Sequence, residues 1–165
     1  MRLHVFKAMT FFQDLSPYQY FLRHEPVGLT PVNVGWLGYG RPFTQGQTSQ
    51  EFKDRLLGFC LDKYVVHIAR GFHVCELCDV TLDQWYDEDK DDHSKYGAGT
   101  EWMSIGDGEI RVIGEAGIYA APTLIYHYVI EHGYQPPDEF IETVLKGSGP
   151  GSEEHQALLA RYRHV

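Results

Sequence analysis

One histidine and two cysteines fall within six residues near the middle of the chain, in the order His73-x-Cys75-x-x-Cys78. Residues two apart in an extended segment point the same way, so His73 and Cys75 can converge on one point. The spacing of Cys75 and Cys78 allows a tight turn to direct both sulfurs at one ion, and two thiolates balance the charge of a dication. The segment therefore predicts a tetrahedral zinc site.

A fourth ligand has to come from elsewhere in the chain. The candidates are a carboxylate or one of the soft side chains of Cys60, His67, His93, His127 and His132. His127 and His132 lie on a predicted helix, but they are five residues apart and so point in different directions, and only one is expected to serve. His127 is preferred. The predicted metal ligands are thus His73, Cys75, Cys78 and His127.

Two other interpretations of the cysteines stay open. Reduced cysteine is a common core residue, so both thiols could be free of metal. Cys75 and Cys78 could instead form a redox pair, although the negative charge of Glu76 between them raises a thiol pKa and so opposes that chemistry. A zinc deaminase carries its histidine and its cysteines on separate helices, whereas they share one short segment here. The site is therefore expected to be structural, unless water fills a fourth position and supports metal-assisted hydrolysis.

Composition narrows the classes of partner. The chain has 165 residues and is predicted to form one domain over residues 1–165. Its net charge of -9, from 14 Lys+Arg against 23 Asp+Glu, repels phosphate backbones and favours a basic partner protein over nucleic acid. No run approaches the roughly 18 apolar residues of a membrane helix, and no secretory signal follows Met1. A cytoplasmic protein without a membrane association is expected.

Capping residues and apolar spacing predict the helices. Thr48 followed by Glu51 is a capping box that predicts a helix over residues 49–62, with Cys60 buried on its apolar face. The other helices are expected at residues 122–132 and 136–146, and from Ser16 and from Ser152.

Alternating or β-branched runs predict short strands at residues 3–7, 32–37 and 64–69. Asp107-Gly108 between strand-like residues predicts a hairpin over residues 105–113, and residues 114–117 offer a second turn. The expected fold class is α+β, with a small, mainly antiparallel sheet and three to four helices packed on it.

Several segments resemble an uncharacterised family of small bacterial proteins. The resemblance rests on Arg70-Gly71-Phe72-His73-Val74-Cys75-Glu76-Leu77-Cys78 and on Tyr119-Ala120-Ala121-Pro122, and it covers about residues 32 to 145. The family has no assigned activity. The resemblance implies that these segments form one unit, and it groups the cysteine segment with residues 119–134.

The sequence as a whole predicts a non-enzymatic protein with one structural zinc ion, acting as a protein-interaction or immunity-type module. The alternative is a metal- or thiol-dependent enzyme, either a zinc-assisted hydrolase or a redox protein that uses Cys75 and Cys78. The sequence contains no Gly-x-Ser-x-Gly elbow, no His-Glu-x-x-His motif and no phosphate-binding loop, which favours the non-enzymatic interpretation.

Overall fold

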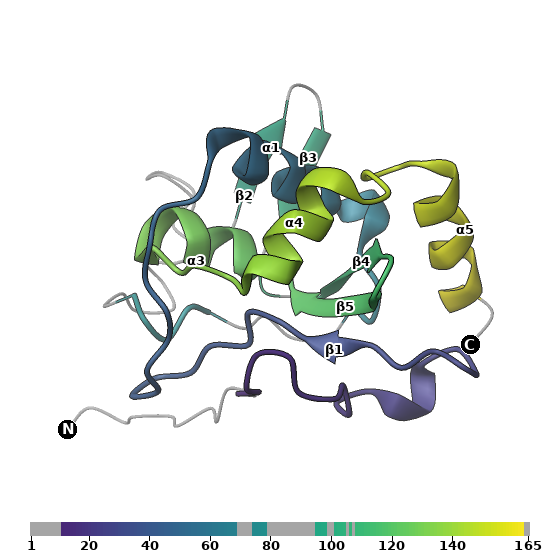
Figure 1. Ribbon diagram of the computed structural model, residues 1–165, viewed down its shortest axis with the longest axis horizontal. Helices are drawn as coiled ribbons and strands as arrows, with labels where there is room; N and C mark the ends of the chain where they lie inside the picture. Colours follow the sequence, from purple (N-terminus) through teal and green to yellow (C-terminus); the bar gives the residue numbers. More distant parts are fainter. Residues whose placement is uncertain are drawn as a thin grey trace.

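A computed structural model describes residues 11–68, 74–78, 95–98, 101–104, 106 and 108–163. These residues form a three-stranded sheet, a separate two-stranded ribbon and four α-helices (Figure 1). The strand predicted at residues 3–7 lies outside the described residues. No helix in the described part of the chain is long and apolar enough to cross a membrane.

The three-stranded sheet has the order β1-β5-β4. Strands β4 and β5 pair antiparallel, whereas β1 pairs parallel to β5; the ribbon pairs β2 with β3 antiparallel. The strands are β1 (Val32–Asn33), β2 (Lys95–Ala98), β3 (Glu101–Ser104), β4 (Glu109–Gly114) and β5 (Gly117–Pro122). The α+β class and the mainly antiparallel sheet are confirmed, and the parallel pair makes the three-stranded sheet mixed.

The hairpin of this sheet turns between Gly114 and Gly117, where the second turn was predicted. The hairpin predicted at Asp107-Gly108 is wrong, because β3 and β4 belong to different sheets. Glu109, the first residue of β4, instead pairs with Val66, and their backbones exchange two hydrogen bonds of 2.9 and 3.0 Å. A Cβ on Gly108 would lie 2.2 Å from Cγ1 of Val65, so only glycine fits this close approach.

The strand predicted at residues 64–69 is also wrong for the described residues, which extend to Ile68. The short 3-10 helix η2 (Asp62–Tyr64) is followed by a single bridge from Val66 to Glu109. Val66 therefore packs at the edge of the sheet without forming a ladder, whereas Ile68 is 67% exposed. β-Propensity reflects the fit of a side chain to a packed surface more than a preference of the backbone.

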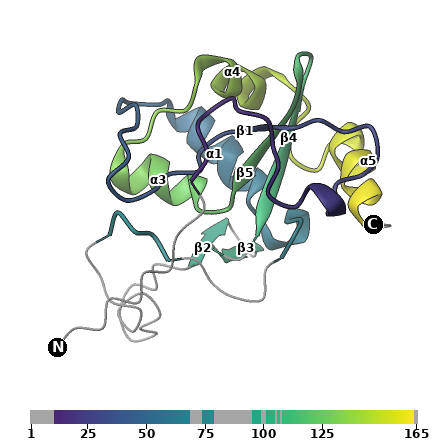
Figure 2. The same cartoon turned by 90° about the horizontal axis from the view of Figure 1, so that it is seen from below.

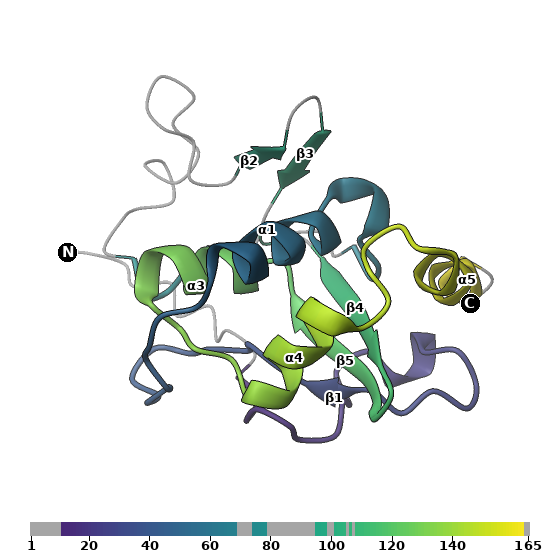
Figure 3. The same ribbon diagram turned by 45° about the horizontal axis from the view of Figure 1, so that its top comes forward.

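The described part of the chain contains four α-helices. Helix α1 buries Phe52, Leu56 and Phe59 at helical spacing, and Cys60 behind it is completely buried as predicted. Helix α1 contacts α3 and α4, whereas α5 lies at the other end of the molecule beside β4 (Figure 3). The helices are α1 (Gln50–Phe59), α3 (Ile125–His132), α4 (Asp138–Lys146) and α5 (Glu153–Tyr162).

The helix predicted from Ser16 does not form. Pro17 bridges to Val32, and the segment contains only the 3-10 helix η1 (Leu22–His24). Its aromatic residues pack on Trp36, for example the Phe12 ring at 5.4 Å between centroids. Burial against this distant tryptophan, which local spacing cannot show, replaces helix formation.

The N-cap of helix α1 can be tested by mutation. Ser49, one residue later than the predicted Thr48, is the N-cap, and its Oγ accepts the backbone N–H of Phe52 at 3.1 Å. Ser49→Ala is expected to lower the free energy of unfolding by about 1 kcal/mol. Thr48→Ala, the matched control, is expected to change it by less than about 0.5 kcal/mol. Urea denaturation measures both, and equal losses would contradict the assignment.

Candidate metal centre

The first half of the candidate centre is a turn made by residues 74–78. The chain bends at Glu76 and Leu77, so that Cys75 and Cys78 lie on either side of the bend. The backbone N–H groups of Leu77 and Cys78 donate hydrogen bonds to the Sγ of Cys75, which favours its thiolate form. Cys75 is only 2% exposed and belongs to the main hydrophobic core. The turn therefore holds its first sulfur in a fixed, buried position.

The second half comes from α3, which follows β5 directly. Ile125, Tyr128 and Val129 bury one side of this helix, and His127 is buried as well, with 1% exposure. The helix ends at His132 because Gly133 adopts the left-handed conformation, with φ of 63°. Figure 2 shows the segment 74–78 beside this helix.

The four side chains converge on one another. The Nε2 of His127 lies 3.2 Å from the Sγ of Cys78, and the Nε2 of His132 lies 3.3 Å from both sulfurs. All four donor atoms lie within 4.8 Å of one another. In a tetrahedral zinc site, with bonds of about 2.3 Å to sulfur and about 2.0–2.1 Å to nitrogen, a sulfur and a nitrogen lie about 3.5 Å apart. The observed separations therefore suit a single ion.

The structure brings together three of the four predicted ligands, Cys75, Cys78 and His127. The fourth, His73, lies outside the described residues, so its part in the site stays a prediction. His132 occupies the remaining corner, and the expectation that it would point away from His127 is wrong. The two imidazole centroids lie 5.2 Å apart, and both Nε2 atoms reach the Sγ of Cys78, because the two side chains are long enough to meet at the cysteine turn. The angular spacing of the two positions on the helix does not take this reach into account, and no local signal in the sequence identifies His132.

Burial determines the protonation of these groups when no cation is near. It raises the pKa of Cys75 to about 12, with a further contribution from nearby Cys78. Burial likewise raises the pKa of Cys78 and lowers the pKa of His132. Cys75, Cys78 and His132 are therefore neutral in the metal-free protein, and a bound dication would displace the thiol protons.

The surroundings position the turn and leave one side of the centre closer to solvent. The Glu76 carboxylate accepts the backbone N–H of Tyr39 at 3.1 Å, which ties the cysteine turn to the glycine-containing turn at residues 38–41. Cys78 and His132 are half-buried, in contrast to the two buried ligands. Cys60 is buried elsewhere in the core and is not among the four clustered residues. Glu76 therefore helps to hold the cysteine turn in place through this hydrogen bond.

A family model described as a domain of unknown function (DUF7919) matches residues 10–145, which include the whole candidate centre. No curated protein and no solved structure matches the chain.

Proposed function

Since this chain belongs to the DUF7919 family, which carries no assigned function, we propose a function from the geometry of the centre: the protein binds one zinc ion through Cys75, Cys78, His127 and His132. The observation that carries the proposal is the convergence of four soft donors within 4.8 Å of one another. Two sulfurs and two imidazole nitrogens in a tetrahedral arrangement are a ligand set that zinc prefers.

The role that best fits this ligand set is structural. Four protein donors complete a tetrahedron, whereas catalytic zinc keeps one position for water. The ion would join the turn at residues 74–78, which contains no helix or strand, to the rigid helix α3, about fifty residues later in the sequence. A cross-link of this kind adds the free energy of metal binding to folding.

Metal analysis of purified variants tests the ligand set. The wild-type protein is expected to contain one zinc ion per chain. His132→Ala is expected to lose most of it, since only three donors remain. His73→Ala, the control on the cysteine segment, is expected to keep the full zinc content, because four donors are present without it. Loss of zinc in His73→Ala with retention in His132→Ala would replace His132 by His73 in the site.

Cobalt substitution separates the structural role from a catalytic one. Co²⁺ in a closed site of two sulfurs and two nitrogens gives tetrahedral d–d bands and thiolate charge-transfer bands, and neither should respond to added azide. Bands that shift with azide would show an exchangeable fourth position and favour metal-assisted hydrolysis.

The biological setting that we propose for this scaffold is protein binding. Helices α1 and α4 pack together and both carry exposed carboxylates, with Glu51 and Asp54 on α1 and Asp138 on α4. Together with the net charge of -9, they support a partner with a basic surface, which such a field would attract.

A further inference from the structure

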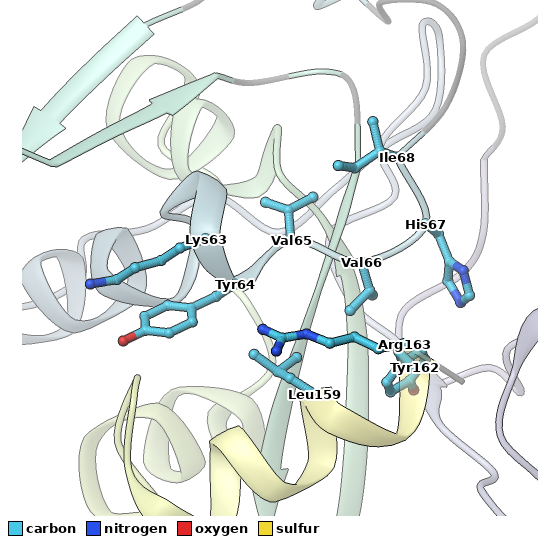
Figure 4. Close-up of a pocket in the computed structure, with 9 residues that line it drawn as sticks. All are labelled: Lys63, Tyr64, Val65, Val66, His67, Ile68, Leu159, Tyr162 and Arg163. Carbon is cyan, nitrogen blue, oxygen red and sulfur yellow. The ribbon is translucent and has the colours of Figure 1, made fainter. Parts of the chain in front are cut away.

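A pocket lies at the opposite end of the fold from α3, between the segment that follows α1 and the last turn of α5. Its volume is about 250 Å³. Figure 4 shows the nine lining residues, which come from residues 63–68 on one side and from Leu159, Tyr162 and Arg163 on the other. The pocket shares no residue with the candidate metal centre.

The lining combines an apolar surface with positive charge. Val66 and Leu159 are buried, whereas Ile68 is 67% exposed and presents its side chain at the rim. Lys63 and Arg163 carry the permanent charges, and none of the described lining residues carries a carboxylate. The positive charges of these two lining residues contrast with the net charge of -9 on the whole chain.

Arg163 is the charged residue of the pocket that is best placed to bind a ligand. It follows the last residue of α5, and Figure 4 shows its side chain extending along the pocket toward Tyr64. No described side chain pairs with its guanidinium. Guanidinium groups bind carboxylates through two parallel hydrogen bonds, so an unpaired arginine beside an apolar surface fits an anion that carries an apolar group.

One wall of the pocket is held in place by buried hydrogen bonds. The His67 Nε2 lies 2.8 Å from a carboxylate oxygen of Glu25, and the Tyr162 hydroxyl donates to the other oxygen at 2.7 Å. Arg111 pairs with the same carboxylate and donates to the Tyr162 hydroxyl at 2.9 Å. These bonds hold His67 with a positive φ of 51°, a conformation that persists only where the surroundings impose it. The pocket is therefore preformed, as small-molecule sites usually are.

We propose that this pocket binds a small carboxylate with an apolar body, whose carboxylate group pairs with Arg163 and whose body packs against Val66, Ile68 and Leu159. The ligand is short, since the pocket volume lies below the roughly 300–1,000 Å³ of most drug-sized sites. The same chemistry is offered by a free aliphatic acid and by the carboxyl terminus of a peptide that ends in an apolar residue. This proposal is independent of the metal centre.

Titration of the full-length protein with hexanoate, followed through NMR signals of the Val66 and Leu159 methyl groups, tests the proposal. Hexanoate is expected to shift both signals in a saturable manner, and hexanamide, which lacks the charge, is expected to bind at least about tenfold more weakly. Shortening the acid to butanoate is expected to weaken binding by up to about fourfold per methylene removed. A peptide ligand is tested in the same way, with acetyl-leucyl-leucine that has a free carboxylate compared with its amide. Tighter binding of hexanoate identifies the ligand as a free aliphatic acid, and tighter binding of the peptide acid identifies it as a peptide carboxyl terminus.

Two exposed positive charges form the matched pair of variants. Arg163→Gln is expected to weaken hexanoate binding about tenfold, whereas Lys146→Gln on α4, which removes an exposed charge that does not line the pocket, is expected to leave it unchanged. Both residues are exposed, so neither variant should unfold. Equal binding of hexanoate and hexanamide, wild-type affinity in Arg163→Gln, or absence of methyl shifts at millimolar hexanoate would each overturn the proposal.

Discussion

Cys75→Ala is expected to abolish stoichiometric zinc binding and to lower the free energy of unfolding by far more than the loss of a core thiol. Three remaining donors bind zinc weakly, and the free energy of metal binding is part of the folding free energy in structural sites. Where free zinc exceeds the dissociation constant a thousandfold, the bound ion stabilises the folded state by about 4 kcal/mol. That contribution should disappear in the variant. Thermal or urea denaturation in the presence of zinc measures the loss.

Cys60 is the matched control for this substitution. Its thiol is completely buried in the same hydrophobic core and does not belong to the metal centre. Cys60→Ala leaves a small cavity and should cost roughly 1–2 kcal/mol, the range typical of a modest core substitution.

A chelator distinguishes the two contributions. Excess chelator should destabilise the wild-type protein and Cys60→Ala by similar amounts, because both lose a bound ion, and should leave Cys75→Ala unchanged. If Cys75→Ala and Cys60→Ala instead lose similar stability, with or without chelator, Cys75 is an ordinary core thiol and the metal proposal fails.

The parts of the fold that the sequence predicts well are those in which local signals agree with tertiary packing. Helix α5 begins after Ser152, whose Oγ accepts the backbone N–H of His155 at 3.3 Å, as its capping chemistry predicts. Helix α1 has its apolar residues at helical spacing and buries them. The segment before β1 fails the same test, because its aromatic side chains find their partner in Trp36, farther along the chain. Sequence patterns within the segment cannot predict a contact with a residue so far along the chain.

In the candidate metal centre, too, the sequence predicts the local part and misses the part that depends on tertiary packing. The spacing of Cys75 and Cys78 identifies the cysteine turn without any knowledge of the fold, because a tight turn is a local structure. The distance between that turn and α3 is set by core packing. The sequence therefore identifies the histidines of α3 as candidate ligands but does not determine which of them reach the sulfurs. The helical angle between His127 and His132 argues against His132 as a ligand, although its Nε2 lies 3.3 Å from both sulfurs.

The buried charges around Arg111 leave no recognisable trace in the sequence. Glu109 and Arg111 are two residues apart on β4 and so face the same way, a pattern typical of a solvent-exposed strand face. In the structure this face is covered, and Arg111 is completely buried. Its guanidinium pairs with Glu109 at 3.0 Å and with Glu25 from a segment 86 residues earlier. A charge is buried here because partners distant in sequence surround it.

Arg111→Met is therefore expected to destabilise the protein by about 3–5 kcal/mol at pH 7, the range observed when one partner of a buried ion pair is removed. The methionine fills much of the volume, so the cost arises from Glu25 and Glu109, which lose their shared cation while they stay buried. Arg55→Met is the control. Arg55 donates to the backbone carbonyl of Val144 at 2.7 Å and lies outside this group, so its loss should cost about 1.5–3 kcal/mol.

The pH dependence distinguishes lost pairing from lost packing. Burial alone would raise the pKa of Glu25, but the hydrogen bond with His67, the charge of Arg111 and the hydroxyl of Tyr162 outweigh it and hold the pKa at about 2. A folded-state pKa below the unfolded value of about 4.3 stabilises the protein above that pH, and the contribution is lost as pH falls toward 2. Burial raises the pKa of Glu109 overall, so its contribution has the opposite sign: it is present at low pH and is lost as pH rises.

Without Arg111, the pKa values of both carboxylates would rise relative to those in the wild type, so both would bind protons more tightly in the folded variant than in the folded wild type. The variant should then gain stability relative to the wild type as pH falls from 7 to about 4.5, since protonation removes the buried unpaired charges. The stability difference between the two chains should shrink over this range, and the difference for Arg55→Met should stay constant. Both chains contain the same candidate metal centre, so its own pH dependence cancels in the comparison. A difference that is independent of pH, measured by urea denaturation at pH 7, 5.5 and 4.5, would show that Arg111 acts through packing instead of charge.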